Sequence, residues 1–300
     1  MTILDLRDAA RRLRPEVPSL PHLREAAIGT WRGRMINEHS SARVFDALAK
    51  QLEAAGVADD VVSEVRGFAD EERRHGILCG AVVEALGGEA YAEIPEGAEV
   101  PAHEDAESPL EAAVRNMLSI CCLSETVAVS LIGAERLEMP SGELRDLLTG
   151  IYADEVGHSR FGWRMLGTLA PQLDVATKER LGDYLEVAFA SLVEHELAHL
   201  PEASQPPPEG AELGLCSGTE ACRLFLDTVE HVIVPALEHH GIPARRAWLA
   251  SEGAARPDDL TRSLPARFTV YAARDESQRP SPRSLDSLCR RRRRALRGRV

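Results

Sequence analysis

The sequence Glu-x-x-His occurs twice in the chain, once as Glu72–His75 and once as Glu155–His158. Three residues span most of a helical turn, so in a helix the carboxylate and the imidazole leave from the same face. Both pairs interrupt stripes of apolar residues spaced three and four apart, which predicts that these faces are buried. One such pair is an ordinary surface feature of a helix. Two pairs on buried faces favour a metal site, because carboxylates and imidazoles are common metal ligands.

Two further carboxylates stand on apolar stripes. Glu38 shares its stripe with Met35 and Phe45, and Glu125 is the only charged residue in the stretch 116–134. A buried, ionised carboxylate is costly unless it is paired or bound to a metal. Together the six side chains supply four carboxylates and two imidazoles, which suit iron or manganese better than copper. Four carboxylates also balance the charge of two divalent ions, so we expect two Fe ions, with a Mn/Fe pair as the alternative.

This set, with one Glu from each of two helices and one Glu-x-x-His from each of two others, resembles the ferritin-like superfamily of di-iron carboxylate proteins, which includes rubrerythrins and di-iron oxygenases. The resemblance covers residues 30–200. The metal ligands that it implies are Glu38, Glu72, His75, Glu125, Glu155 and His158. It also implies that Glu72 and either Glu125 or Glu155 bridge the two ions.

The same resemblance implies supporting residues around the metal ligands. In related oxygenases an Asp just before the second Glu-x-x-His bonds the His of the opposite helix, and Asp154 stands at that position, where it would orient His75. Glu71 stands at the equivalent position before the first motif, but it is a longer acid, which leaves that role open. Tyr152 lies one turn before Glu155 and is a further candidate hydrogen-bond donor to the site.

Long helices must position these residues. Aromatic residues make up only 4% of the chain, and a core of Ala, Leu and Val favours helix over strand. Apolar periodicity predicts helices over 31–55, 59–87, 108–136, 141–169 and 173–199. The long connection between the second and third helices lacks periodicity, as a crossover would. We therefore expect an all-α protein: a ferritin-like four-helix bundle with a long crossover between helices 2 and 3 and additional C-terminal helices.

Proline and glycine divide the chain into five expected segments. They are an N-terminal arm at 1–29, the di-iron helical bundle at 30–200, a Pro-rich linker at 201–214, accessory helices at 215–253 and a disordered basic tail at 254–300. The accessory helices could cap the bundle and shape a substrate pocket.

Composition narrows the functional classes. The net charge of the 300 residues is −13, and the tail from residue 279 is rich in Arg, so the body of the chain is more acidic still. An acidic body argues against a general surface for nucleic acid or anionic membranes. The N-terminus lacks the apolar core of a signal peptide, and the most apolar stretch, at 116–134, contains a Glu and several Ser. We therefore expect a cytoplasmic protein with no membrane span.

A di-iron carboxylate centre activates O2 or peroxide, so the resemblance implies an oxidase or monooxygenase that oxidises a small organic substrate. An external protein would donate the electrons, and a homodimer stays open. A rubrerythrin-like or ferritin-like peroxidase or ferroxidase also stays open, although the six cysteines form no Cys-x-x-Cys pair of the rubredoxin type. A third alternative is a metal-binding scaffold without catalysis.

A competing motif lies at the end of the fifth predicted helix. The sequence HELAH at 195–199 matches His-Glu-x-x-His, in which two histidines bind zinc and the Glu acts as general base in zinc proteases. Glu220 is a conceivable third ligand. The plain interpretation is a polar helix end before Pro201, and no nearby strand is predicted to hold a peptide substrate. The zinc protease is therefore the weakest of the alternatives.

Overall fold

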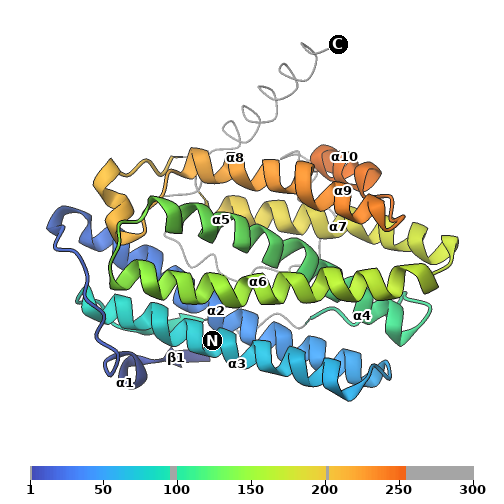
Figure 1. Cartoon of the computed structure of the whole chain (residues 1–300), viewed down its shortest axis with the longest axis horizontal. Coiled ribbons are helices and arrows are strands. Elements are labelled where there is room, and N and C mark those ends of the chain that lie inside the picture. Colours follow the sequence, from blue (N-terminus) through green and yellow to red (C-terminus); the bar gives the residue numbers. More distant parts are fainter. Residues whose placement is uncertain (1, 95–99, 201–202, 255–300) are drawn as a thin grey trace, which may run out of the picture.

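The structure, a computed structural model, describes residues 2–94, 100–200 and 203–254. In these ranges the protein is all-α, with long packed helices and one two-stranded sheet. The long helices run side by side along the longest axis of the molecule (Figure 1). All but the first residue of the predicted basic tail lies outside the described residues.

Four helical runs carry the residues of interest. They are α2 (Arg24–Ala54), α3 (Asp59–Ala85), a run made of α4 (Pro109–Met117), η2 (Leu118–Ser124) and α5 (Glu125–Glu138), and α6 (Glu143–Leu169). α2 begins before the predicted start at residue 31, because a short 3-10 turn, η1 (Pro21–Leu23), leads directly into it. Proline is tolerated in a first helical turn, so it did not end the helix here.

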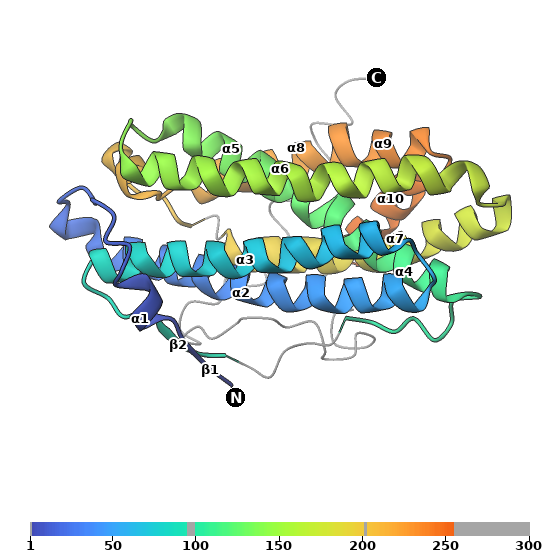
Figure 2. The same ribbon diagram turned by 60° about the horizontal axis from the view of Figure 1, so that its bottom comes forward.

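These helices pack as two pairs. α2 and α3 form a hairpin whose turn contains Gly56 at a φ of 73°, a conformation that favours glycine, and α5 packs against α6. Figure 2 shows α2 and α3 in one layer and α5 and α6 in the other. α3 contacts α6 across the layers, whereas α2 and α5 make little direct contact.

The first residues of the chain pack against the connection that follows α3. Strand β1 (Thr2–Asp5) pairs antiparallel with β2 (Tyr91–Ile94), with Thr2 opposite Ile94, and helix α1 (Arg7–Ala10) packs against α3. This sheet was not predicted, since each strand is only four residues long and has no strong alternation of its own. Pairing of segments so far apart in the sequence stabilises strands that local preference would not.

Helices after α6 cover the same core from another side. They are the 3-10 turn η3 (Ala170–Gln172), α7 (Val175–His199), η4 (Pro208–Leu213), α8 (Gly218–Thr228), the π-helical η5 (Val229–Ile233), α9 (Val234–His239) and α10 (Ala244–Ala254). Asp174 caps α7 by accepting a hydrogen bond from the Thr177 backbone N–H at 2.7 Å. α7 packs against α4, η2 and α10, and α8 packs against α5. These segments therefore extend the packed core of the first helices.

The described core falls into two apolar clusters with a polar layer between them. Along α2, Met35 belongs to one cluster and Phe45 to the other, with Glu38 between them. The same order recurs on α3, where Glu72 and His75 separate the two clusters, and on α6, where Glu155 and His158 do so. Burying such a layer is unfavourable unless its charges are neutralised within it.

One described helical run, Pro109–Glu138, is long and apolar enough to cross a membrane when judged by length and composition alone. Core helices of globular proteins pass the same test. In this structure the run packs against α6 and α8, and it contributes Glu125 to the polar layer. Of the most apolar 18-residue window of this run, 44% is buried inside the protein.

Candidate metal centre

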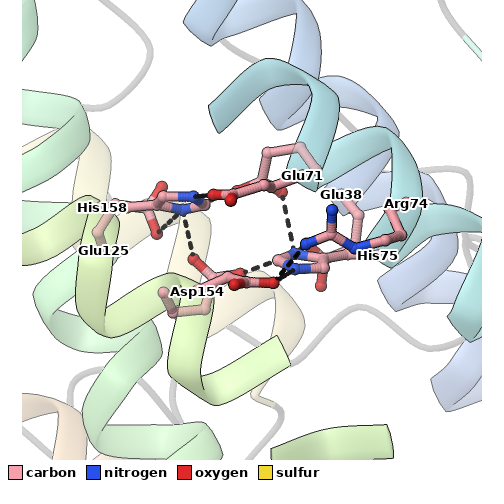
Figure 3. A network of polar contacts seen from close by, with 9 residues as sticks. Glu38, Glu71, Arg74, His75, Glu125, Asp154 and His158 are labelled. Carbon is pink, nitrogen blue, oxygen red and sulfur yellow. Dashed lines mark hydrogen bonds and ion pairs between the residues drawn. The ribbon is translucent and has the colours of Figure 1, made fainter. Parts of the chain in front are cut away.

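The six predicted ligand residues lie together between α2, α3, α5 and α6 (Figure 3). Their ligand atoms form two groups, in each of which all atoms lie within 4.8 Å of one another. The first group is Glu38, Glu72, His75 and Glu155, and the second is Glu72, Glu125, Glu155 and His158. Glu72 and Glu155 belong to both groups. Each group could hold one metal ion, and the two shared carboxylates lie where they would contact both ions.

Each histidine is oriented by a carboxylate from the opposite helix. Nε2 of His75 on α3 lies 3.0 Å from Oδ2 of Asp154 on α6, and Nε2 of His158 on α6 lies 2.9 Å from Oε2 of Glu71 on α3. Nε2–H is thereby the donor in both rings, which leaves Nδ1 to face the cluster. A carboxylate behind a ligating imidazole is a common arrangement in metal sites. Glu71, whose role the sequence left open, thus contacts His158 in the same way as Asp154 contacts His75.

Glu155 lies between the two halves of the cluster. Its Oε1 is 3.2 Å from Nδ1 of His75, and its Oε2 is 3.0 Å from Nδ1 of His158. Glu72 is also close to both rings, at 3.9 Å from Nδ1 of His75 and 3.2 Å from Nδ1 of His158. Glu38 approaches only His75, at 3.7 Å, and Glu125 only His158, at 4.0 Å. Glu38 and Glu125 therefore belong to opposite ends of the cluster.

The electrostatics of the cluster call for added positive charge. Burial, together with the neighbouring carboxylates, raises the pKa of Glu72 and of Glu125 well above the usual range. Burial lowers the pKa of His75, but contacts with Glu155 and Glu38 outweigh it and raise that pKa to about 11. Without a metal, protons are therefore favoured on Glu72, on Glu125 and on the two imidazoles, whereas hydrogen bonds to His158 and His75 outweigh burial and lower the pKa of Glu155. Two divalent cations would replace these protons with a matching charge.

Two buried atoms of the cluster lack a hydrogen-bond partner. Among the described residues, Oε2 of Glu72 and Nδ1 of His75 are inaccessible to solvent and make no hydrogen bond of acceptable geometry, although Nδ1 of His75 has an ion-pair contact of 3.2 Å with Oε1 of Glu155. Each such atom costs free energy in a folded protein unless it is satisfied in another way. Both atoms belong to the first ligand group, so a cation placed there would satisfy them. The residues present therefore fit a metal in chemistry, charge and position.

A π-helix immediately precedes Glu125. The run α4–η2–α5 contains π-type turns over Leu118–Ser124, and Glu125 is the first residue after them. Wider turns of this kind are rare in proteins, and those that occur often lie at functional sites. Gly162 on α6 lies directly against this segment, where an added Cβ would be 2.6 Å from the Cβ of Cys121. The absence of a side chain at Gly162 therefore lets α6 approach the π-helix one turn after His158.

Apolar side chains shield one end of the cluster, and a cavity borders it. The ring of His158 packs against Phe45 and Phe68, with centroid distances of 5.1 and 4.5 Å. A cavity of about 2060 Å³ extends between α2, α5, α7 and α8, and Glu38, Glu72, Glu125 and Glu155 line it. Its wall is mostly apolar. Small-molecule sites typically have about 300–1,000 Å³, so this cavity could admit a large organic molecule as far as the cluster.

Two other predicted features do not join the cluster. The ring of Tyr152 packs beneath the guanidinium of Arg136, 4.9 Å from the ring centroid, and within the described residues it makes no hydrogen bond to the ligands. The HELAH residues end α7, where the His195 and His199 rings lie 4.4 Å apart. In the part of the chain that the structure describes, they form no group of three metal-ligating side chains. They line the same cavity instead.

The arrangement is a buried group of carboxylates and imidazoles that could hold metal, and it borders a mostly apolar cavity. Sequence reasoning found all six clustered side chains and Asp154. It did not find the π-helix, which leaves no signal in apolar periodicity. It expected the accessory helices to shape a pocket, and α8 does line the cavity, but it did not expect α7 to form a wall. Comparison with protein-family models, with curated proteins and with solved structures finds no match to this chain.

Proposed function

We propose that this chain is a ferritin-like, non-haem di-iron protein that uses O2 to oxidise a small organic substrate. The observation that carries the proposal is the sharing of Glu72 and Glu155 by two overlapping ligand groups. A single-ion site needs neither two groups nor two shared carboxylates. Four carboxylates and two imidazoles, donated by four helical runs, make the donor set expected for two iron ions, and a Mn/Fe pair would use the same ligands.

Within this proposal each residue has a distinct task. Glu38 and His75 would hold one ion and Glu125 and His158 the other, and Glu72 and Glu155, which belong to both groups, would be shared between them. Asp154 and Glu71 fix the two imidazoles with Nδ1 toward the ions. Phe45 and Phe68 keep water from the His158 side. Reduced iron, when bound, supplies the electrons that activate oxygen.

The cavity favours substrate oxidation over the alternatives. A ferroxidase or peroxidase needs access only for iron, oxygen or peroxide, whereas this cavity is several times larger than any of these and reaches four of the ligands. Its mostly apolar wall suits an organic molecule. We further propose that an external protein donates electrons and that the protein works in the cytoplasm.

Metal binding is the first test. Anaerobic titration with ferrous ion, followed by removal of unbound metal and iron analysis, should give two equivalents per chain. Glu125→Gln should retain fewer, because it removes a ligand with little change in shape. Glu138→Gln is the matched control, since Glu138 is an exposed residue at the end of the same helix. Fewer than two equivalents in the unaltered protein, or equal retention in both variants, would overturn the di-iron proposal.

Oxygen consumption separates an enzyme from a scaffold. With ferrous protein, a reductant and a suitable organic substrate, oxygen uptake should exceed the amount needed to oxidise the bound iron, and an oxidised product should accumulate. Screening a library of organic molecules by oxygen electrode would identify such substrates. Uptake that always stops at the stoichiometry of iron would point to a ferroxidase or a scaffold instead.

A further inference from the structure

One face of α7 forms a wall of the cavity. Ala188, Leu192 and Glu196 follow one another at intervals of four residues, so they lie in a row along the helix, and all three line the cavity. At 1.5 Å per residue the row is about 12 Å long. Leu131 and Ile132 of α5 line the same cavity. The row therefore begins apolar and ends at a carboxyl group.

Glu196 has no charged partner among the residues that the structure describes. It is half-buried, and among the described residues its carboxyl group makes no hydrogen bond or ion pair. Burial alone raises its pKa to about 7, with no contribution from any neighbouring charge. Its neighbour His195 cannot supply a positive charge, since burial and His199 lower the pKa of His195 to about 4. Glu196 is thus a partly buried carboxyl on the cavity wall with no cation of the described residues within ion-pair distance.

Glu196 differs in this respect from the other charged residues of the wall outside the metal cluster. Several are paired within the protein: Arg34 with Glu135, Arg115 with Asp105 and Glu111, Arg180 with Glu111, and Asp183 with Arg246. The others are exposed, namely Glu25, Glu138, Glu220 and Arg223. Among the described wall residues outside the metal cluster, Glu196 is therefore the charged group that is neither paired nor fully exposed.

We propose that the cavity binds an organic amine with a large apolar body, whose ammonium group lies at Glu196 and whose body extends along Ala188 and Leu192. An ammonium ion would complete the missing ion pair, with the neutral ring of His195 close by. An organic anion would instead meet Glu196 and the acidic cluster, and an alcohol would leave the charge of Glu196 uncompensated. The proposal rests on the proposed function for the fate of the amine, although binding itself needs no turnover.

Three probes of equal chain length test the charge preference. Isothermal titration calorimetry at pH 8 would compare octylamine, 1-octanol and octanoate, which carry a cationic, a neutral and an anionic head on nearly the same body. The protein would be measured both with ferrous ion bound under anaerobic conditions and without metal. Octylamine should bind at least tenfold more tightly than 1-octanol, and octanoate more weakly than either.

Glu196→Gln should remove the advantage of octylamine and leave 1-octanol binding unchanged, because the amide keeps the shape and loses the charge. Glu194→Gln is the matched control, since Glu194 is exposed on the same helix. Circular dichroism would confirm that both variants are folded. Equal affinities for octylamine and 1-octanol, or the same loss in both variants, would overturn the proposal. If iron fails to bind but octylamine selectivity persists, the di-iron proposal fails and the amine site stands.

Discussion

Asp154 and Glu71 decide which nitrogen of each histidine faces the cluster. Both acids are partly exposed, while the rings they contact are fully buried. Arg74 holds Asp154 from the other side through a 2.7 Å contact. Since a ligating imidazole loses affinity when it can rotate or change tautomer, these acids should influence the metal without touching it.

Asp154→Ala should therefore weaken iron binding by about 10–100-fold, because His75 would lose the acceptor that fixes its Nε2–H. Competition with a ferrous chelator under anaerobic conditions measures the loss. Asp146→Ala, at an exposed position earlier in α6, should leave the affinity unchanged. Equal affinity in both variants would show that Asp154 has no orienting role.

Glu125→Gln should make the metal-free protein more stable. Burial and the nearby Glu155 and Glu72 raise the pKa of Glu125. At neutral pH the folded state must therefore either take up a proton at Glu125 or bury its negative charge. The unfolded state needs neither, because its carboxylate is exposed to water, so this carboxyl lowers the free energy of unfolding. The amide removes this cost, and the free energy of unfolding should rise by on the order of 1 kcal/mol. Urea denaturation with a chelator present measures the change. A decrease in stability would mean that the carboxylate is satisfied without metal.

The ligand residues could be predicted because each is a polar side chain on an otherwise apolar helical stripe. Periodicity places a residue on a face, and the cost of burying a charge indicates a metal. Periodicity does not show whether a side chain has the right length to contact its partner. It therefore could not decide whether Glu71, which is longer than Asp, would contact His158. It also placed Tyr152 near the site by its position on α6, whereas the ring turns toward Arg136.

At the scale of elements, the close contact of α6 with the π-helix η2 positions the second half of the cluster. Gly162 makes this contact possible, since the Cβ of any other residue would lie within 3.0 Å of both a backbone carbon and a sulfur of the cysteines in η2. Glu155 and His158 precede it on the same helix. Movement of α6 away from η2 would separate them from Glu125.

Gly162→Ala should lower the free energy of unfolding by about 1–3 kcal/mol, because the added methyl overpacks the contact with Cys121. It should also weaken iron binding. Gly150→Ala, on the same helix, meets no atom within 4 Å and should stabilise the protein by up to about 1 kcal/mol through helix propensity. Thermal or urea unfolding of both variants checks the opposite signs. If both substitutions lowered the free energy of unfolding, the contact between Gly162 and Cys121 would not explain the loss.

The long helices were predicted close to their observed positions because each has a sustained apolar period. The pairing of β1 with β2 was not, since it depends on a contact between the first residues and the crossover. The π-helix was also missed, because one wider turn hardly changes the apolar pattern. Local sequence thus specifies helices better than the contacts and irregular turns between them.

At the scale of the whole molecule, the cluster divides the core into two apolar parts. Met35 and Ile151 lie on one side, and Phe45 and Phe161 lie on the other. Without metal, this polar layer holds several carboxylates close together in the buried core. Bound metal would link the four helical runs through the ligands that they share. The stability of the entire fold should therefore depend on metal.

Iron added anaerobically should raise the melting temperature in proportion to the logarithm of its free concentration. At 100 times the dissociation constant one site contributes about 2.7 kcal/mol, which corresponds to roughly 5–10 °C for a chain of this size. Differential scanning calorimetry with a series of metal concentrations measures it, and a chelator should reverse it. Glu125→Gln should show a smaller shift. If the melting temperature of the unaltered protein did not change with iron concentration, metal binding would not contribute to the stability of the fold.

The position of α7 in the chain has a consequence for biosynthesis. All six clustered side chains lie between residues 38 and 158, whereas the wall bearing Ala188, Leu192 and Glu196 follows them. A ribosome makes the N-terminal part first, but domains generally fold as units. The helical runs that bear the clustered side chains are therefore synthesised before α7, and their packed core is complete only when α7 and the later helices have joined it. A chain truncated before α7 would retain all six clustered side chains and lack one wall of the cavity and part of the core.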